Sequence, residues 1–488
     1  MSDLAPRPSR LGTWLDQRAG WRKLMQEGLD EPVPGGSRWA YVFGSGLLFI
    51  FLNQAITGMF LALYYVPSAD HAHSTVAYIQ KAVAAGGFLR SLHSYGSSVM
   101  VVLVLLHLGQ TLLFGAYKSR RELLWLVGCI LFLLVLGMGF TGYLLPWDQN
   151  SYAATAVATN IIAEVPLVGA GLQEFLRGGA ELGTLTLSRF FAFHVFFIPG
   201  LIMAAVVAHV FLFRRAGAAG PPRTAEQLRR LPSELFFPRQ VLKDFAFGIA
   251  LSAALMAFSI KWPALLGPTA NPTDSTYIPR PEWYYRPILE WLKFWPGRSI
   301  IVGIVVVPVV VLGLLFGLPF IDRSPERRPW RRPFSVGGFF VVLGSLVALG
   351  VVDHMDDLRD PDVHEKLIAQ EEAEIRFAKA PFQPEEASPA GAAQTTRALS
   401  PEAAKGALLF VSDSCVSCHG TEAKGGSGKI RLGDLTKEHS AAGLRALIKR
   451  PNGAMLRGGM DTSHLSDEEI TDIAAYLAEV TAGRTSAS

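Results

Sequence analysis

Seven stretches of the 488-residue chain are almost wholly apolar, and each is long enough to cross a membrane as a helix, which needs about 20 such residues. They lie at about 40–65, 90–115, 122–145, 189–213, 241–262, 299–320 and 334–352. Residues 146–188 and 263–298, between them, are long and rich in glycine, proline and aromatic residues, whereas alternate connections are short or basic. The pattern predicts an all-α, polytopic membrane bundle of seven transmembrane helices.

The polarity of the chain changes after residue 352. Residues 353–399 begin as a charged segment whose middle could be helical, and they end in alanine, proline and glutamate, which is the composition of a linker. Ser400 and Pro401 provide an N-cap and an N1 proline for a following helix. Ser466 and Glu469 form a capping box that begins a later helix. A compact, soluble α-helical domain is therefore predicted over residues 400–482.

Composition and charge placement support a membrane protein with a fixed orientation. Only 18% of residues are charged, against about 25% in soluble chains. The segments on one side of the predicted bundle hold 21 Lys and Arg residues, and the segments on the other side, which include both long loops, hold six. Because basic loops stay cytoplasmic, we expect a cytoplasmic N-terminus and a C-terminal domain on the opposite, periplasmic side. We call these the basic side and the long-loop side.

The first forty residues lack the apolar core of a signal peptide. Residues 11–29 form either an amphipathic helix at the membrane interface or an ordinary surface helix. The net charge of +4 is small, and nothing in the sequence indicates a surface that binds nucleic acid.

Four histidines occur as pairs within two of the apolar stretches. His93 and His107 are 14 residues apart, and His194 and His209 are 15 apart. At 100° per residue, both spacings return to nearly the same side of an α-helix, about 21 Å further along its axis. Ionisable groups inside a membrane are functional by default. We therefore predict two bis-histidine b-type haems, His93 with His194 near the long-loop side and His107 with His209 near the basic side.

Glycines in the first and third stretches repeat this spacing. They are Gly44, Gly58, Gly128 and Gly142. Flat macrocycles between helices need positions without side chains, and ordinary small-residue helix packing is the alternative. Arg90 and Arg189 lie just before the first histidine of each pair, placed to pair with haem propionates or to extend to the membrane interface.

The C-terminal domain contains the attachment sequence of a c-type haem. In Cys415-x-x-Cys418-His419 the two thiols bind the haem covalently, and the histidine binds its iron. The adjacent histidine and the two framing helices favour haem over zinc binding or thiol exchange. A thioether is expected as sixth ligand, and Met460 is preferred because it lies five residues before Leu465 at the last helix. The alternatives are Met455 and His464.

Residues 10–352 resemble the cytochrome b of quinol–cytochrome c and quinol–plastocyanin oxidoreductases. "LHSYGSSVMVVLVLLHLG" and "LSRFFAFHVFFIPGLIMAAVVAHVFLFRRAG" are similar to its haem helices. "GYLLPWDQ" (142–149) and "RPEWYYRP" (280–287) are similar to the two halves of its quinol-oxidising pocket. "PWDQ", "KSRREL" and the histidine spacing favour the plastid and cyanobacterial branch. The C-terminal domain resembles a class I cytochrome c.

The resemblance implies five parts: a cytoplasmic amphipathic N-terminus (1–39), a four-helix haem domain (40–228), a three-helix domain like subunit IV (229–352), a linker (353–399) and a cytochrome c domain (400–482). It implies the core subunit of a cytochrome bc complex, an enzyme that oxidises quinol, bifurcates its electrons in a Q cycle and translocates protons. The expected cofactors are two non-covalent haems b, one covalent haem c, and quinol or quinone.

Within this resemblance, quinol is expected to bind on the long-loop side. The implied pocket residues are Pro146, Trp147, Pro281 and Trp283. Glu282 is a carboxylate in an apolar pocket, so its pKa should be raised and it can accept a proton from quinol. Tyr284 is expected to help close the pocket. On the basic side, the implied inner quinone site contains Arg214, Lys243 and Asp244. No cysteine lies near Phe43, where some relatives tether a third haem, so none is expected there.

Several partners are expected. Three cysteines cannot supply an iron–sulfur cluster as well as a c-type haem, so a Rieske protein is implied. The other expected partners are the quinone pool, the lipids of a bacterial inner membrane and a second copy of the complex. The expected electron acceptor is a soluble or membrane cytochrome c or a terminal oxidase. The rival hypotheses are a haem-b anchor of another respiratory oxidoreductase and a non-enzymatic redox anchor that only carries electrons.

Overall fold

The computed structural model describes residues 10–20, 23, 28–272, 274, 276–383, 400–412, 441–451, 455 and 462–482. The chain divides into two compact units, Met1–Phe382 and Gln383–Ser488. Among the described residues, seven helices have the length and apolar composition of membrane spans, and all lie in the first unit, which confirms the predicted all-α polytopic fold.

The spans are η1 (Trp39–Tyr41) with α3 (Val42–Ala62); α5 (Gly86–Leu113); α6 (Glu122–Tyr143); α9 (Thr184–Ala192) with η2 (Phe193–Phe197) and α10 (Ile198–Ala216); α12 (Arg239–Lys261); η3 (Gly297–Ser299) with η4 (Val302–Val306) and α14 (Val307–Ile321); and α15 (Pro333–Arg359). The shorter elements of this unit are α1 (Arg10–Ala19), α4 (Ala72–Lys81), α7 (Gln149–Ala163), α8 (Gly169–Arg177), α11 (Ala225–Arg229), α13 (Arg286–Leu292), η5 (Pro329–Arg331) and α16 (Pro361–Lys379).

Two of the spans contain a π-helical turn, η2 and η4. Each turn ends two residues before a proline, Pro199 or Pro308. Proline cannot donate a backbone hydrogen bond, and its ring crowds the carbonyl four residues earlier, so a wider turn relieves the conflict. A π-helical turn accommodates one more residue than an α-helical turn, which matters for the histidine spacing below.

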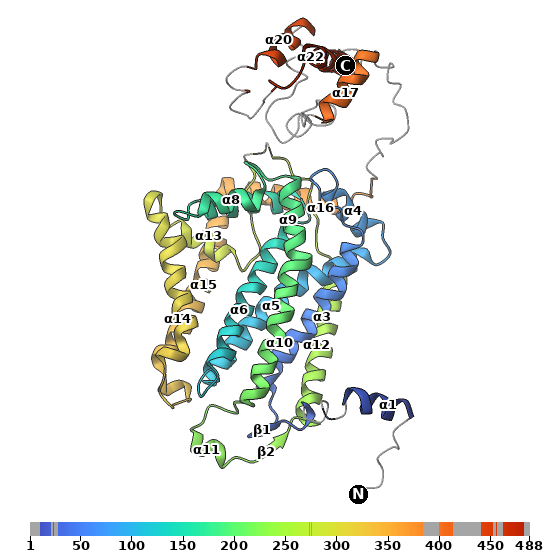
Figure 1. The fold of residues 1–488 in the computed structure, drawn as a ribbon. Coiled ribbons are helices and arrows are strands. Elements are labelled where there is room, and N and C mark those ends of the chain that lie inside the picture. The colour runs from blue at the N-terminus through green and yellow to red at the C-terminus, as the bar shows by residue number, and fades with distance from the viewer. Residues whose placement is uncertain are drawn as a thin grey trace. The chain divides into compact units, whose positions relative to one another are not determined.

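The spans pack side by side, with α3 against α5, α6 against α10, and α12 against both α3 and α5 (Figure 1). Helices α4, α8, α13 and α16 cover the long-loop ends of the spans (Figure 1). At the opposite end, β1 (Pro32–Pro34) and β2 (Ser233–Leu235) form a two-stranded antiparallel sheet with Val33 opposite Glu234. This sheet joins the segment before α3 to the segment before α12.

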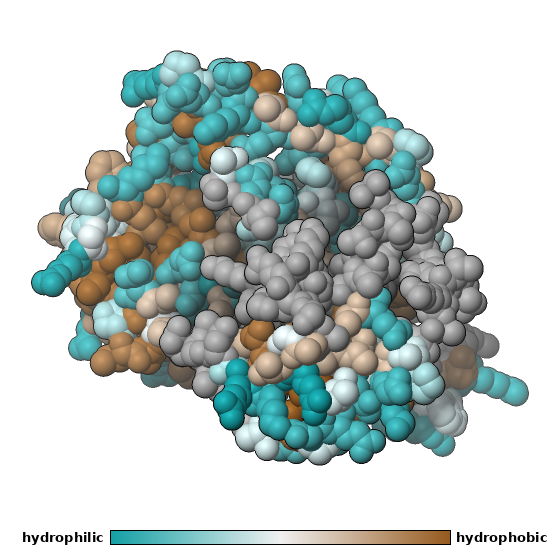
Figure 2. All heavy atoms as spheres, turned by 90° about the horizontal axis from the view of Figure 1, so that it is seen from above, coloured by the Kyte–Doolittle hydropathy of each residue, from teal (hydrophilic) through white to brown (hydrophobic). Residues whose placement is uncertain are grey.

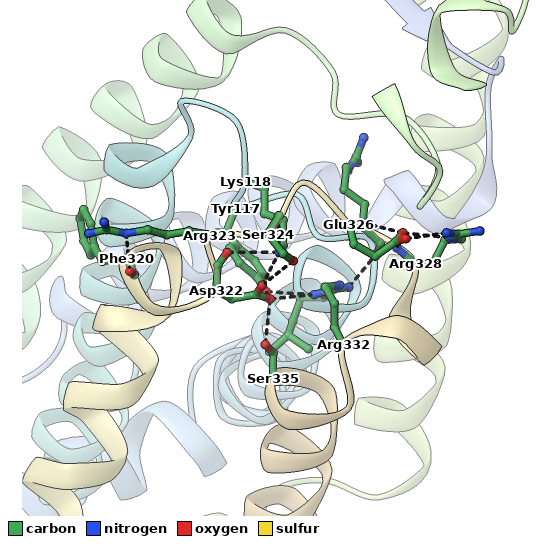
Figure 3. A network of polar contacts seen from close by, with 12 residues as sticks. Tyr117, Lys118, Phe320, Asp322, Arg323, Ser324, Glu326, Arg328, Arg332 and Ser335 are labelled. Carbon is green, nitrogen blue, oxygen red and sulfur yellow. Dashed lines mark hydrogen bonds and ion pairs between the residues drawn. The ribbon is translucent and has the colours of Figure 1, made fainter. Parts of the chain in front are cut away.

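A buried polar network on the basic side fastens the α5–α6 connection to the α14–α15 connection (Figure 3). Asp322 accepts hydrogen bonds from the hydroxyls of Tyr117 at 2.5 Å and Ser335 at 2.8 Å, and it pairs with Lys118. Arg332 donates to the Tyr117 hydroxyl at 2.9 Å. Because these charged groups are paired and hydrogen-bonded, they can be buried without a large desolvation cost. The network holds the last two spans against α5 and α6.

The outward faces of the last two spans are strongly apolar. On α14, Val309 and Leu314 are 63% and 57% exposed, and on α15 Phe334 and Val341 are 94% and 67% exposed. Figure 2 shows brown, hydrophobic residues gathered on the left of the view, the side on which α14 lies in Figure 1. An uninterrupted apolar face of this kind suits contact with lipid rather than water.

The second unit is built on α17 (Pro401–Ser412), α20 (Ala441–Lys449) and α22 (Asp467–Ala482). Gly406 allows α17 and α22 to touch, since a Cβ there would lie 1.9 Å from the Asp472 carbonyl oxygen. Beside this contact, the rings of Phe410 and Tyr476 are 5.5 Å apart. Both predicted helix starts are present: Ser400 Oγ accepts from the Ala403 amide, and the Ser466–Glu469 capping box forms.

Candidate functional site

The four intramembrane histidines meet as the two predicted pairs. The rings of His93 on α5 and His194 in η2 have centroids 6.1 Å apart. The rings of His107 on α5 and His209 on α10 have centroids 6.4 Å apart. The π-helical turn around His194 takes up one extra residue, so the 15-residue spacing in this span aligns with the 14-residue spacing on α5.

The separation of each pair fits a metal held between two imidazoles. With metal–nitrogen bonds of about 2.0 Å, the centroids of two axial imidazole rings lie roughly 6 Å apart. For His93 and His194, the Nδ1 atoms are already engaged, with Thr57 Oγ1 at 3.0 Å and with the Met138 carbonyl at 3.1 Å. Their Nε2 atoms are therefore the ones left for an iron atom.

Two threonines that support these histidines were missed in the sequence analysis. Thr57 Oγ1 lies 3.0 Å from His93 Nδ1, and Thr141 Oγ1 lies 3.3 Å from His194 Nδ1. Each threonine directly precedes one of the predicted haem glycines, in the repeated dipeptides Thr57-Gly58 and Thr141-Gly142. This repetition is a signal that could have identified them. Such supporting hydrogen bonds orient a ligating imidazole.

Each of the four glycines faces one histidine. A Cβ would lie 2.4 Å from His194 Cε1 at Gly142, 2.9 Å from His93 at Gly58, 3.2 Å from His209 at Gly128 and 3.4 Å from His107 at Gly44. The bare α-carbons therefore give the imidazoles room to stand between the helices. The role predicted for these glycines, haem packing, stays a prediction, and their contact with the ligand rings is an observation that supports it.

Replacement of each of these glycines by alanine is expected to impair haem binding, and the effect should be larger where the new Cβ would lie closer to the facing histidine. Gly142→Ala should cause the greatest loss of b-type haem and Gly44→Ala the least, because the new Cβ would overlap its histidine most at Gly142 and least at Gly44. The b-haem content of purified protein, from reduced-minus-oxidised spectra, measures this. Gly313→Ala, on α14 with no heavy atom within 4 Å of the new Cβ, is the matched control. Equal loss for Gly44→Ala and Gly142→Ala would contradict the expectation.

The two arginines predicted to pair with propionates have protein partners in this structure. Arg90 is buried and donates to Gln80 Oε1 at 2.7 Å, to the Ala264 carbonyl at 2.9 Å and to the Leu265 carbonyl at 3.0 Å. Arg189 donates to the Phe175 carbonyl. Arg90 thus anchors the segment after α12, and pairing with propionates stays a prediction for both.

The two sequence segments expected to form the quinol pocket lie together. The Tyr143 hydroxyl donates to the Arg280 carbonyl at 3.1 Å, and Asn150 exchanges hydrogen bonds with the backbone of Arg280 at 2.8 and 2.9 Å. Trp147 is buried, with its ring 5.2 Å from that of Tyr152. These contacts hold Pro146 and Trp147 in the same region as Pro281.

Glu282 lies among aromatic side chains in this region. Burial raises the pKa of its carboxyl group, and burial raises the pKa of Tyr284 and Tyr285 as well. The ring of Tyr284 is 5.4 Å from that of Trp283, whose Nε1 donates to Ser98 Oγ at 3.3 Å. A carboxyl group in such surroundings holds a proton at a higher pH than an exposed glutamate does, and in its ionised form it is a stronger base.

Two aspartates at the end of α15 position this loop, and the sequence analysis did not identify them. Asp357 pairs with both Arg280 and Arg286, which flank the Glu282 segment. Asp353 also pairs with Arg286, at 2.5 Å. Both aspartates are at least 93% buried. Asp353 and Asp357 are four residues apart, so the sequence indicates that they share one face of a helix. It does not indicate their arginine partners, which lie about 70 residues away in the sequence.

The three residues predicted for the inner quinone site do not share one hydrogen-bonded cluster. Lys243 donates to the Ser37 carbonyl at 2.9 Å and lines a cleft of about 490 Å³ with Gly35, Gly36, Ser37, Glu234, Arg239 and Leu242. Asp244 is buried and accepts from Gln240 Nε2 at 2.9 Å. Arg214 lies 3.6 Å from Glu31. The inner site stays a prediction.

The predicted haem c ligands Cys415, Cys418, His419 and Met460 lie outside the described residues. Within the described part of this unit, the framing helices α17 and α22 are in contact, and Met455 and His464 are described.

Comparison with protein families finds matches along most of the chain. Residues 29–217 match the model described as cytochrome b/b6/petB, and residues 269–361 match cytochrome b(C-terminal)/b6/petD. Residues 401–477 match the model described as cytochrome C oxidase, cbb3-type, subunit III. The haem families therefore coincide with the histidine-containing spans and with the second unit.

Individual relatives agree with these matches. The chain is 39% identical over 221 residues to the menaquinol:cytochrome c reductase cytochrome b subunit of Geobacillus thermodenitrificans, covering 44% of this chain and 99% of the relative. It is 35% identical over 318 residues to the cytochrome bc complex cytochrome b subunit of Chlorobaculum thiosulfatiphilum, covering 64% and 72%. A solved structure of a hyperthermophilic respiratory Complex III is similar with a TM-score of 0.64 and 30% identity, over 75% of this chain and 96% of that one.

Proposed function

We propose that this chain, which belongs to the cytochrome b family of cytochrome bc complexes, is the core subunit of a quinol–cytochrome c oxidoreductase. In this proposal the complex oxidises quinol on the long-loop side, bifurcates its electrons in a Q cycle and translocates protons. The observation that carries the proposal is the presence, in one helical bundle, of two facing histidine pairs with ring centroids 6.1 and 6.4 Å apart.

The haem sites are assigned to residues that fit them. His93 with His194, and His107 with His209, would each hold one haem b, and Cys415, Cys418, His419 and Met460 would hold the haem c. These groups supply one-electron transfer when bound. The protein's part is to position the imidazoles, through Thr57 and Thr141, and to leave space beside them at the four glycines.

Proton transfer at the outer pocket is assigned to the chain itself. Glu282 in its ionised form accepts a proton from a quinol hydroxyl, and its raised pKa makes it a better base than an exposed glutamate. The Arg280–Asp357 and Arg286–Asp353 pairs hold the loop in place, so that the carboxylate keeps its position during turnover. Tyr284, which lies within electrostatic range of Glu282, would help to close the pocket beside the quinol ring.

The surroundings of the complex follow from the same proposal. A Rieske iron–sulfur protein would be the partner that accepts the first electron, and the haem c held by Cys415, Cys418 and His419 would connect it to a soluble or membrane cytochrome c or a terminal oxidase. The relative from Geobacillus is named a menaquinol:cytochrome c reductase subunit, which favours menaquinol as substrate. We place the complex, as a homodimer, in the bacterial cytoplasmic membrane with its N-terminus cytoplasmic and the cytochrome c unit periplasmic.

Purification of the native complex tests the proposal. We expect oxidation of a reduced menaquinone analogue to be coupled to reduction of cytochrome c, and a ratio of about two haems b to one haem c, as four axial histidines and one attachment motif require. Removal of the Rieske partner should stop turnover without loss of haem. Turnover that persists without it, or a different haem ratio, would refute the proposal.

A further inference from the structure

Helix α16 follows the last span and is docked on the long-loop side of the first unit. The family match to the C-terminal part of cytochrome b ends at residue 361, where α16 begins. Gln370 exchanges hydrogen bonds with the backbone of Ile278 at 3.1 and 3.4 Å. Lys81 donates to the Phe377 carbonyl at 2.6 Å and lies 4.0 Å from the centroid of its ring. The helix is therefore fastened to both α4 and the loop that contains Glu282.

This docking brings a carboxyl group of α16 next to the "PWDQ" segment. A Cβ built on Gly267 would lie 3.4 Å from Glu374 Cγ and 3.6 Å from Asp148 Oδ2. The Gly267 amide donates to the same Asp148 oxygen at 3.3 Å. Three distant segments thus bring the side chains of Glu374 and Asp148 close to the same glycine.

Tyr143 is the group on which Glu282 and these two carboxyl groups all act electrostatically. Tyr143 lies at the end of α6, and its hydroxyl donates to the carbonyl of Arg280 at 3.1 Å, two residues from Glu282. Asp148, Glu282 and Glu374 all act electrostatically on this hydroxyl. The Tyr143 hydroxyl is therefore within electrostatic range of the carboxyl group at the quinol pocket and of both carboxyl groups beside Gly267.

The environment of Glu374 suits a group that exchanges protons at neutral pH. Burial, with the negative charges of Asp148 and Glu371, raises the pKa of Glu374 to about 7. The charged and titratable groups that face this region are Glu371 of α16, Asp148 before α7, Tyr277 of the loop, His73 and Lys81 of α4 and Arg90 of α5. Glu374 is only half-buried, so it also has access to solvent.

We propose that Glu374, paired with Asp148, receives the proton that leaves Glu282 after quinol oxidation and releases it to the solvent on the long-loop side. This inference rests on the proposed function. Oxidation of quinol to quinone gives up two electrons and two protons, and the electrons go to the one-electron acceptors of the complex. The route proposed here carries a proton only: Glu282 accepts it from a quinol hydroxyl, and water and the Tyr143 hydroxyl conduct it to the Glu374 carboxylate.

The test compares Glu374→Gln and Glu374→Asp with Glu372→Gln in the purified complex. Glu372 is exposed on the same helix and pairs with Arg376, which makes it a matched control. We expect Glu374→Gln to slow quinol oxidation by about tenfold. This loss is smaller than that usually caused by removal of a general acid or base, because water can partly replace Glu374 as the proton acceptor. The inflection of the rate near pH 7 should disappear in this variant, whereas Glu374→Asp and Glu372→Gln should keep it.

Infrared difference spectra over pH supply a measurement that does not depend on turnover. A protonated carboxyl signal that titrates near pH 7 should be present in the wild-type complex and absent from Glu374→Gln. A wild-type rate and pH profile in Glu374→Gln, or the same infrared titration in both proteins, would refute the role of Glu374. Absence of quinol oxidation in the wild-type complex would instead refute the proposed function.

Discussion

Glu282→Gln is expected to lower the rate of quinol–cytochrome c reduction by roughly 10²- to 10⁴-fold, the usual contribution of a general base. Glutamine has nearly the same shape, but it cannot accept the quinol proton. Both haems b should remain bound, since Glu282 lies in the loop between α12 and α13 and not on a haem span. Steady-state rates and haem spectra of the same preparation measure the two effects.

The rate of quinol–cytochrome c reduction by the wild-type complex should also depend on pH through Glu282. Only ionised Glu282 can act as the base, so the rate should fall as the pH falls through its pKa, which burial raises above the usual value for glutamate. Glu282→Gln should lack this acid limb. Glu164→Gln, an exposed glutamate on the same side, is the control and should keep both rate and limb. An unchanged rate in Glu282→Gln would exclude it as the base.

His107→Ala is expected to abolish one of the two haems b and all turnover. The residue provides half of the pair with His209, and no other described histidine lies within ring contact of that pair. The haem b to haem c ratio should fall from about two to about one, because an axial ligand is essential for non-covalent retention. Pyridine haemochrome analysis of the purified complex measures the ratio.

An exposed histidine supplies the comparison. His354→Ala, on α15, should keep the ratio and the activity of the wild type. Retention of two haems b in His107→Ala would show that this histidine is not an axial ligand. Loss of both haems together with the α-helical signal in circular dichroism would indicate a failure to fold, in which case His107→Met, which keeps a possible ligand, distinguishes folding from ligation.

The spans and the histidine pairs were predictable because they depend on local sequence periodicity. A run of about 20 apolar residues must form a helix in a membrane, since lipid offers no hydrogen-bond partners for the backbone. The His93–His107 spacing then needed only helical geometry. The π-helical turn at His194 was less obvious, although Pro199 indicated it, and it brings the 15-residue spacing into line.

Other parts of the site depend on contacts between distant segments. Asp357 belongs to a charged stretch in which nothing distinguishes it from Asp356, yet it is buried and binds Arg280 and Arg286. Glu374 lies in the charged segment whose middle could be helical from its sequence, and nothing in that sequence shows where the helix docks. Neither role could be inferred locally, because the partners lie about 70 to 230 residues away in the sequence.

The sequence by itself determined the seven apolar spans, the two histidine pairs and the attachment motif for haem c, since each depends on residue type and short-range spacing. Only the tertiary structure decided which glycine faces which imidazole, which aspartates hold the Glu282 loop, and that α16 brings Glu374 beside Asp148. The physical reason is that burial and electrostatic coupling arise from side chains that meet only after the spans have packed.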